Sequence, residues 1–512
     1  MAAWLAVLQD AQKLQDSGLP GEASSLYRTG LETYADDPIA VQWLTFNLMM
    51  SESAFSGAKS AQVYLPSILE SSLSWKAKLY AIELALASAD ISDDNSGLYA
   101  AVCKAAEAYS RAQLTPDDFN LMSCQAIVRQ LTRLYGQDGL HQLFLSIDNE
   151  DRFDCIGSHP SRPASLKPPT QSNRLPQVLQ RSLENQPPPE RALGLRHVGP
   201  AFVLKLGDNT VLFDKKGQVL DTPYGSLPAF LKIALTGVFK TLVPGPSSVS
   251  GTTLFIGDYF SQALNYCHWV SDGLPRIIVA HTQGLNPDNI LGAFEITENF
   301  QVETIDRLLQ PHQTYISVQA TDGLMAIDDL FYADNHSLKH VHHPLYGGDL
   351  ILVQALRQAL TKDLPAPKIR RRLYVPRRHT RVVLNDDAVR ACLTPYGFEI
   401  VDTDQLSFAE QVEIFSAAEA VVAPHGAALT NLIFARPNCK VLEFFPPFGG
   451  SASFYYIAHA LGFDYACTID DTSQGPHRDV GEGIISNTAG IEVDVDFVRR
   501  WLDILPDISA SH

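Results

Sequence analysis

The strongest constraint on the fold is an alternation of strand and helix patterns in the last third of the chain. Short apolar runs at 372–375, 398–401, 420–423 and 440–445 alternate with helix signals at 388–393 and from 407 to about 418. Ser407 and Glu410 have the spacing of a capping box, which marks the start of a helix. This order requires parallel strands with right-handed crossovers, and ligands of such sheets bind at the carboxyl ends of the strands. We therefore predict an open α/β sheet with a binding site at that edge.

Residues 1–150 have a different, helical pattern, with apolar residues three and four apart and almost no strand signal. Small and large residues alternate around Ala11, Ala23 and Tyr27, which resembles a tetratricopeptide helical hairpin, where small residues let two helices approach. The match is incomplete, because Gly30 stands where alanine is usual. A plain helical bundle therefore remains the alternative.

A proline-rich segment at 151–192 separates this region from the rest, and we interpret it as a linker that a short helix near 177–185 interrupts. Beyond it, strand and helix signals alternate. The first two strands, at 201–206 and 210–213, have the pattern of a hairpin.

Charge and cysteine content exclude several classes of protein. The chain has 39 Lys and Arg against 57 Asp and Glu, a formal net charge of −18, which disfavours general binding to nucleic acids and anionic membranes. Its 7 cysteines form no Cys-x-x-Cys pair, so neither a zinc ribbon nor a disulfide framework is expected. The first residues lack the pattern of a signal peptide, and no segment has the roughly 18 consecutive apolar residues of a membrane span. We expect a cytoplasmic protein.

One segment reverses this acidic character. Between 368 and 381 every charged side chain is basic. Arg377, Arg378 and Arg381 follow the strand at 372–375, where guanidinium groups can hold a diphosphate through paired hydrogen bonds. A solvated basic loop is the alternative.

A second signal for anion binding follows the strand at 420–423. His425 and Gly426 lead directly into a helix pattern that begins at Ala427. The start of a helix offers free backbone amides, glycine permits close approach of a ligand, and alanine leaves room for a phosphate. Alone this turn is a weak signal, but together with the arginine loop it predicts a nucleotide diphosphate site.

A third group lies at Asn265, His268 and Asp272, which form one polar stripe on a predicted helix. A histidine and a carboxylate one turn apart can supply a general base, or a base with its orienting partner. A buried His–Asp pair that only supports the helix is the alternative.

Two further patterns suggest metal binding less strongly. Asp402 and Asp404 have the spacing of a metal-binding Asp-x-Asp, although capping of the following turn is the favoured interpretation. A histidine cluster has ligand-like spacing, yet histidines in a loop are more often simply polar: His336, His340, His342 and His343. We expect no metal site. A serine hydrolase is disfavoured because no Gly-x-Ser-x-Gly occurs.

Six ordered motifs carry a resemblance to a known family. They lie at 265–276, 373–378, 396–401, 406–411, 423–431 and 441–446. In this order they resemble the motifs of the family 61 glycosyltransferases, once catalogued as a domain of unknown function. The resemblance runs from about residue 254 to 447 and does not include the N-terminal helices.

The resemblance implies a GT-B-like pair of Rossmann-type domains, here preceded by an all-α helical-hairpin domain. Residues 193–348 would form the acceptor half and residues 349–512 the half that binds a nucleotide sugar, generally a UDP-sugar. Family members act by inversion at the anomeric carbon without a metal-binding Asp-x-Asp, so no cofactor is expected.

The resemblance also suggests individual contacts to the donor. Arg377 stands where the family has its pyrophosphate arginine, and Glu443 where a strand-end acid can accept hydrogen bonds from ribose hydroxyls. Pro376 replaces the usual serine, which removes a hydroxyl and a backbone donor. The full set expected on the donor side is Arg377, Arg378, Arg381, His425, Gly426, Ala427, Asn431 and Glu443.

The expected mechanism is a single displacement. Asp272 is the first candidate for the base and His268 the second, with His425 a further candidate and Asn265 on the acceptor side. The arginines and the amides after Gly426 would stabilise the departing diphosphate in place of a metal.

The acceptor and the biological setting leave alternatives open. We expect a glycan or lipid-linked glycan as acceptor in bacterial surface polysaccharide synthesis. One alternative is a protein O-glycosyltransferase. Another is a scaffold whose helices bind a protein partner and whose transferase half is inactive.

Overall fold

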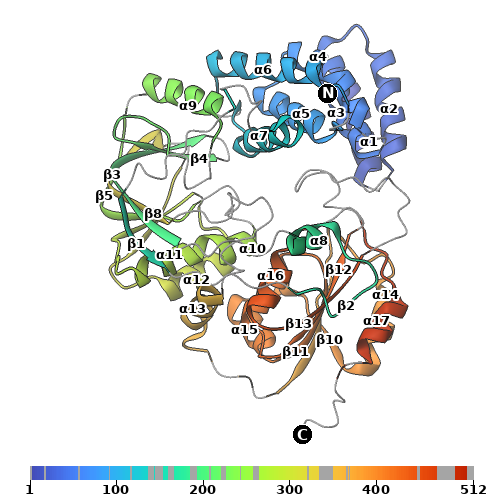
Figure 1. The fold of residues 1–512 in the computed structure, drawn as a ribbon, viewed down its shortest axis with the longest axis vertical. Coiled ribbons are helices and arrows are strands. Elements are labelled where there is room, and N and C mark those ends of the chain that lie inside the picture. Colours follow the sequence, from blue (N-terminus) through green and yellow to red (C-terminus); the bar gives the residue numbers. More distant parts are fainter. Residues whose placement is uncertain are drawn as a thin grey trace.

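The structure is a computed structural model. It describes residues 3–16, 19–55, 58–90, 93–115, 118–136, 143–144, 154–159, 167–184, 193–206, 209–220, 227–242, 244–257, 265–293, 295–319, 322–333, 350–364, 367, 369–446, 450–469, 490–503 and 505. These residues form a helical region and two sheets with their covering helices (Figure 1).

The helical region consists of elements that pack on their neighbours in sequence order. They are α1 (Trp4–Asp16), α2 (Pro20–Thr33), α3 (Pro38–Phe55), α4 (Ala58–Glu70), α5 (Trp75–Ala87), α6 (Ser96–Arg111) and α7 (Leu121–Tyr135). A Cβ on Gly30 of α2 would lie 2.9 Å from Val7 Cγ1 of α1 and 3.3 Å from Leu44 Cδ1 of α3. The glycine that departs from the repeat pattern therefore lies where three helices approach closely.

The first sheet has the order β1-β3-β8-β5-β6-β7, with β4 paired to β3. Its strands are β1 (Asp154–His159), β3 (Leu193–Leu206), β4 (Asn209–Asp214), β5 (Pro244–Phe255), β6 (Asn289–Gly292), β7 (Thr314–Ser317) and β8 (Leu324–Ala333). Strands β8, β5, β6 and β7 are parallel, whereas β3 is antiparallel to β1, β4 and β8. The predicted hairpin is confirmed as β3 and β4, and the sheet is mixed.

The helical region and the first sheet share one hydrophobic core. The contact passes through α9 (Ala229–Thr241), whose Phe230 ring lies 5.6 Å from that of Tyr109 on α6 and 5.8 Å from that of Phe144. Asn209 Nδ2 also donates to the carbonyl of Phe119 at 3.3 Å. The helices are therefore packed directly against the sheet.

The second sheet confirms the predicted parallel arrangement. Its order is β10-β9-β11-β12-β13-β2, and every pair is parallel. The strands are β9 (Arg371–Tyr374), β10 (Phe398–Ile400), β11 (Ala418–Pro424), β12 (Lys440–Phe445), β13 (Asp464–Ile469) and β2 (Gln171–Ser172). The associated helices are α13 (Leu350–Thr361), α14 (Asp386–Leu393), α15 (Phe408–Ser416), α16 (Ser453–Ala460) and α17 (Val495–Leu502). The capping box at Ser407 and Glu410 is present at the start of α15.

The proline-rich segment contributes to both sheets. Strand β1 pairs with β3 of the first sheet, whereas β2 pairs with β13 of the second. Helix α8 (Gln177–Glu184) follows, and Leu179 on it is fully buried. In Figure 1, β2 and α8 are green but lie beside the orange and red elements of the second sheet. The chain thus passes from the first sheet to the second and back again at β3.

The two sheet regions are joined by a common core and by polar contacts. In α12 (Asn299–Leu308), Glu303 accepts hydrogen bonds from the backbone amides of Phe408 and Ala409, each at 3.2 Å. A carboxylate here satisfies free amides of α15 and complements its dipole. None of the helices in the described part of the chain combines the length and apolar character needed to cross a membrane.

The edge pairing yields a first prediction. Asn173 Nδ2 donates to the carbonyl of Ile469 at 3.1 Å, and its Oδ1 accepts from the amide of Ile469 at 3.0 Å. Asn173→Ala removes both bonds and should lower the free energy of unfolding by about 1–3 kcal/mol. Urea denaturation measures this change.

Gln180→Ala on the exposed face of α8 is the control, because it removes only the surface bond from Gln180 to Glu184. Equal stability of the two variants would contradict a structural role for this segment in the second sheet.

Candidate active site

The two anion-binding signals of the sequence meet in the structure. A Cβ built on Gly426 would lie 1.8 Å from Nη1 of Arg377 and 2.9 Å from its Cζ. The backbone of Gly426 has φ 175°, an extended conformation open to any residue. Any larger residue at this position would have to displace the Arg377 guanidinium, which lies directly across the Cα of Gly426.

Arg377 is held in this position by its own loop. Its Nε donates to the carbonyl of Thr380 and its Nη2 donates to Thr380 Oγ1, both at 2.8 Å. These bonds use one edge of the guanidinium group and leave Nη1 directed at Gly426. The loop after β9 thus fixes a cation at the end of β11.

Arg381 places a second positive charge beside the first. Burial, and secondarily the charge of Arg377, lower the pKa of Arg381 to about 10. Its Nε has no hydrogen-bond partner among the described residues, and its φ of 55° is left-handed, which is strained for a residue other than glycine. Burial also lowers the pKa of Arg377. Two poorly hydrated cations of this kind favour a bound anion.

Arg378 has a different environment from its neighbour. Its side chain is 58% exposed and forms an ion pair with Asp402. Asp402 precedes the 3₁₀ turn Thr403–Gln405 without forming a side-chain cap, and Asp404 acts electrostatically on Arg377. The Asp-x-Asp pattern therefore faces the arginine loop, and the predicted capping role of Asp402 is wrong.

The helix predicted after Gly426 is a 3₁₀ helix, η9 (Ala427–Phe434). Its first bond joins the amide of Leu429 to the carbonyl of Gly426 at 2.9 Å. The segment is apolar except for Thr430 and Asn431, so its sequence pattern did not distinguish α from 3₁₀ geometry. The start of the helix and its free amides still lie next to Arg377.

His425 and Glu443 form a buried pair at this turn. His425 Nδ1 lies 2.5 Å from Glu443 Oε1, and Glu443 is fully buried with its other oxygen 2.5 Å from the hydroxyl of Tyr465. Burial lowers the pKa of His425, while the charge of Glu443 acts in the opposite direction. Direct contact between Glu443 and ribose hydroxyls does not fit this arrangement, because the carboxylate is fully buried behind His425 and Tyr465.

The third predicted group lies on an unusual helix. Asn265 caps α10 (Tyr266–His268), accepting from the amides of Cys267 at 3.0 Å and His268 at 3.4 Å. The chain continues as the π-helix η4 (Trp269–Gly273) and as α11 (Leu274–Thr282). Short π-helical segments occur often at functional sites. Asn265 thus has a clear role in positioning the segment.

His268 and Asp272 form a hydrogen-bonded pair across this π-helix. His268 Nδ1 lies 2.7 Å from Asp272 Oδ2. The His268 side chain is 26% exposed, whereas that of Asp272 is only 3% exposed. Histidine is therefore the accessible member of the pair, with the carboxylate behind it.

A direct contact joins the His268 segment to the second sheet region. Tyr266 Oη donates to Asn431 Oδ1 at 2.7 Å, and α10 packs against η9. Asn431 Nδ2 in turn donates to Gln411 Oε1 of α15 at 2.8 Å. Asn431 thus connects three elements, and the segment with His268 lies against the helix that begins beside Gly426.

Several residues of this site were not found from the sequence. Thr380 and Tyr465 bond to predicted residues, but each lies outside the motif where its partner occurs. Tyr266 and the fully buried Arg276 lie inside the first motif, where only the spacing of polar residues was used. Arg276 Nη1 donates to the carbonyl of Gly257, directly after β5, at 3.0 Å.

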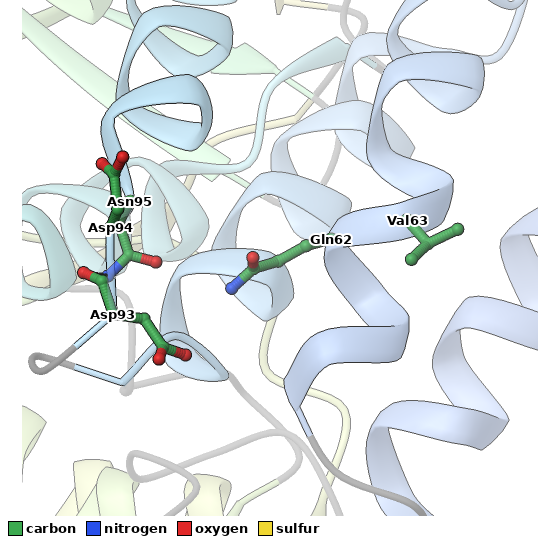
Figure 2. A pocket seen from close by; sticks show the side chains of 5 residues that line it. All are labelled: Gln62, Val63, Asp93, Asp94 and Asn95. Atoms are coloured by element: carbon green, nitrogen blue, oxygen red, sulfur yellow. Dashed lines mark hydrogen bonds between the residues drawn. The ribbon is translucent and has the colours of Figure 1, made fainter.

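Hollows elsewhere in the described structure lack such a cluster of cations. One, of about 460 Å³, lies in the helical region beside Gln62 and Asp93 (Figure 2). Figure 2 shows Gln62 extending toward Asp93 and Asp94, whereas Val63 points away. A second hollow, of about 740 Å³, lies between Pro168 and Arg500. Among the described residues no group of three or more His, Cys, Asp or Glu is placed to hold a metal, and His336, His340, His342 and His343 lie outside those residues.

Comparison with known proteins indicates which family the region around this site resembles. Residues 266–442 match the family model described as Glycosyltransferase 61. The chain is also 26% identical over 148 residues to alpha-1,3-arabinosyltransferase XAT3 of Oryza sativa subsp. japonica. That alignment covers 26% of this chain and 25% of the rice protein. Residues 266–442, which the family model matches, contain the π-helix, the arginine loop and the Gly426 turn.

The contact at Gly426 yields a second prediction. Gly426→Ala should displace the Arg377 guanidinium and weaken binding of inorganic diphosphate about ten- to hundredfold. This is the loss of affinity that corresponds to one hydrogen bond to a charged group. Isothermal titration calorimetry measures the affinity.

Arg377→Ala provides the matched background. Adding Gly426→Ala to it should change the affinity little, because the colliding group is already absent. If the two substitutions lower the diphosphate affinity additively, the alanine does not act by displacing Arg377.

Proposed function

We propose that this chain, whose residues 266–442 form a family 61 glycosyltransferase domain, transfers a sugar from a nucleotide sugar, a UDP-sugar, to a hydroxyl acceptor with inversion. The observation that carries this proposal is the Arg377 guanidinium lying across Gly426 with Arg381 beside it. A GT-B-like architecture, with the donor on the second sheet and the acceptor near the first, accompanies it.

The diphosphate of the donor would be bound between the arginines and the start of η9. Arg377 Nη1 and Arg381 Nε are the available donors, and the amides that follow Gly426 add to them. As the bond from the sugar to the phosphate breaks, negative charge grows on the leaving diphosphate. Fixed cations in a poorly hydrated turn stabilise that charge, so we propose that the reaction proceeds without a metal.

We propose His268 as the base, with Asp272 as its orienting partner. His268 is the more exposed member of the pair, and it bonds to Asp272 through Nδ1. The neutral imidazole would remove the proton of the acceptor hydroxyl, and the carboxylate would stabilise the resulting cation. From the sequence alone, Asp272 ranks before His268 as the candidate base, and this proposal reverses that ranking.

The acceptor we propose is a glycan or a lipid-linked glycan. The arabinosyltransferase among the relatives supports transfer of a sugar without deciding between hexose and pentose. A protein partner for the helical region and a cytoplasmic location in surface polysaccharide synthesis stay predictions.

The assignment of the base is tested by paired variants. His268→Asn should lower kcat by about 10²–10⁴-fold, the usual contribution of a general base, and leave UDP affinity unchanged. Asp272→Asn should lower kcat less, because the imidazole remains. His281→Asn, at the far end of α11, is the matched control. A larger loss for Asp272→Asn than for His268→Asn would identify the carboxylate as the base.

Nucleotide binding separates an enzyme from a scaffold. Calorimetry with UDP should show binding that Arg381→Ala weakens, and hydrolysis of UDP-, GDP- and dTDP-sugars should select one donor. EDTA should leave activity unchanged, because the arginines neutralise the diphosphate. Absence of heat with every nucleotide would favour the scaffold, and loss of activity with EDTA would favour a metal.

A further inference from the structure

A continuous chain of buried hydrogen bonds runs from β13 to the loop before α16. The Tyr465 hydroxyl donates to Glu443 Oε2 at 2.5 Å, and Glu443 Oε1 lies 2.5 Å from His425 Nδ1. At the other side of the imidazole, Nε2 accepts from the backbone amide of Ser451 at 3.1 Å. Tyr465, Glu443 and His425 are all buried. We refer to these four residues as the Tyr465 relay.

The donors and acceptors fix the protonation of the imidazole. The Ser451 amide can only donate, so Nε2 must be the unprotonated nitrogen, and Nδ1 carries the proton that Glu443 accepts. Tyr465 must donate, because an ionised carboxylate only accepts. His425 is therefore neutral and fully engaged, which removes it from the candidates for the base.

Packing fixes the His425 imidazole and the Gly450–Ser451 backbone relative to each other. A Cβ on Gly450 would lie 2.9 Å from His425 Cδ2, so the loop backbone rests directly on the imidazole. Phe445 stacks on the same ring with centroids 5.2 Å apart, and the Phe454 ring lies at 5.2 Å as well. The loop can hold this position only while His425 keeps its orientation.

The relay ends beside the proposed diphosphate site. His425 immediately precedes Gly426, across which Arg377 lies. Both Arg377 and Arg381 act on His425 electrostatically, and Glu443 acts on Arg381. A change in the relay would therefore be transmitted to the turn that receives the leaving group.

We propose that Tyr465 and Glu443 are positioning residues for the nucleotide sugar: through His425 they hold the Gly450–Ser451 backbone against the Gly426 turn, where it forms one wall of the donor site. This proposal rests on the proposed function. It assigns Glu443 a role behind the site in place of a contact to ribose, and it adds Tyr465 and Ser451, which lie outside the motifs.

Two substitutions of His425 separate the two bonds of its ring. His425→Gln reaches as far as Nε2 and can still accept from Ser451, whereas His425→Asn reaches only to Nδ1 and can still donate to Glu443. If the wall is held as proposed, His425→Asn raises the donor KM about tenfold, and His425→Gln restores most of the affinity with kcat nearly unchanged. Equal KM values for the two variants would overturn the proposal.

Tyr465→Phe tests the far end of the relay with a milder change. It should raise the donor KM about threefold and leave kcat unchanged. Tyr109→Phe is the matched control, since Tyr109 is also fully buried but its hydroxyl has no hydrogen-bond partner among the described residues. A donor KM for Tyr465→Phe equal to that of the control would overturn the proposal, even if the His425 variants failed to fold.

Glu443→Gln distinguishes positioning from direct chemistry. Gln keeps one acceptor for His425 Nδ1, and the Tyr465 hydroxyl can rotate to accept from its amide. The donor KM should therefore change by less than threefold. A loss of kcat of a hundredfold or more would show that the carboxylate itself acts on substrate and would overturn the proposal.

The pH dependence gives an independent readout. Burial holds the pKa of His425 below its usual range, with Arg377 and Arg381 acting in the same direction and Glu443 against them. Protonation at Nε2 would break the bond to Ser451, so the donor KM of the wild type should rise on the acid side, below the ordinary histidine pKa of about 6.5. His425→Gln should lack this rise, and its persistence there would count against the relay.

Hydrogen exchange keeps the two proposals distinguishable. The peptide that contains Ser451 should exchange slowly in the wild type and in His425→Gln, and faster in His425→Asn, with no nucleotide present. Slow exchange with no nucleotide binding would confirm that the relay holds the Ser451 backbone, but it would reject the proposed function and the positioning role with it. Fast exchange in the wild type with intact UDP binding would reject the relay alone.

Discussion

The site depends on two guanidinium groups held close together in a turn that water hydrates poorly. Burial disfavours the charged state of both groups, and the charge of Arg377 adds to this effect at Arg381, so a bound anion would offset the cost. Several features of the local structure serve this arrangement: Thr380 fixes Arg377, Gly426 leaves space beneath it, and Arg381 adopts a strained backbone conformation. In the proposed function, a turn built this way is arranged for a diphosphate before the ligand binds, which would lower the reorganisation needed during transfer.

The contact between the two sheet regions matters for the proposed reaction because it fixes His268 relative to the arginines. Tyr266 and Asn431 join the π-helix to η9, and Glu303 binds the start of α15 from the opposite region. The histidine on one side is therefore held at a fixed place relative to the arginines on the other. Because both sides share one hydrophobic core, the position of the proposed base relative to the proposed diphosphate site is set mainly by packing.

The sequence predicted those features of the fold and site that local patterns determine. The parallel strands, the hairpin at β3 and β4, and the capping box at Ser407 follow from short-range periodicity and spacing, and the meeting of Arg377 with Gly426 follows from their places at strand ends. Long-range pairings were not accessible in this way. Asn173 bonds to Ile469 and Tyr465 to Glu443, and nothing in the neighbouring sequence of either residue indicates its partner. The choice of His268 over Asp272 as the proposed base also depends on how buried each side chain is, which their spacing in the sequence does not give.

The passage of the chain through both sheets before β3 bears on how this architecture can be recombined. Strand β2 and helix α8 are encoded upstream of the first sheet's main strand, yet they complete the edge and the core of the second. A chimaera that joined residues 350–503 to the first-sheet region of another protein would leave an open strand edge and an uncovered apolar surface. A transplant of the second sheet would have to include residues 167–184 as well, so this structural unit is discontinuous in the chain.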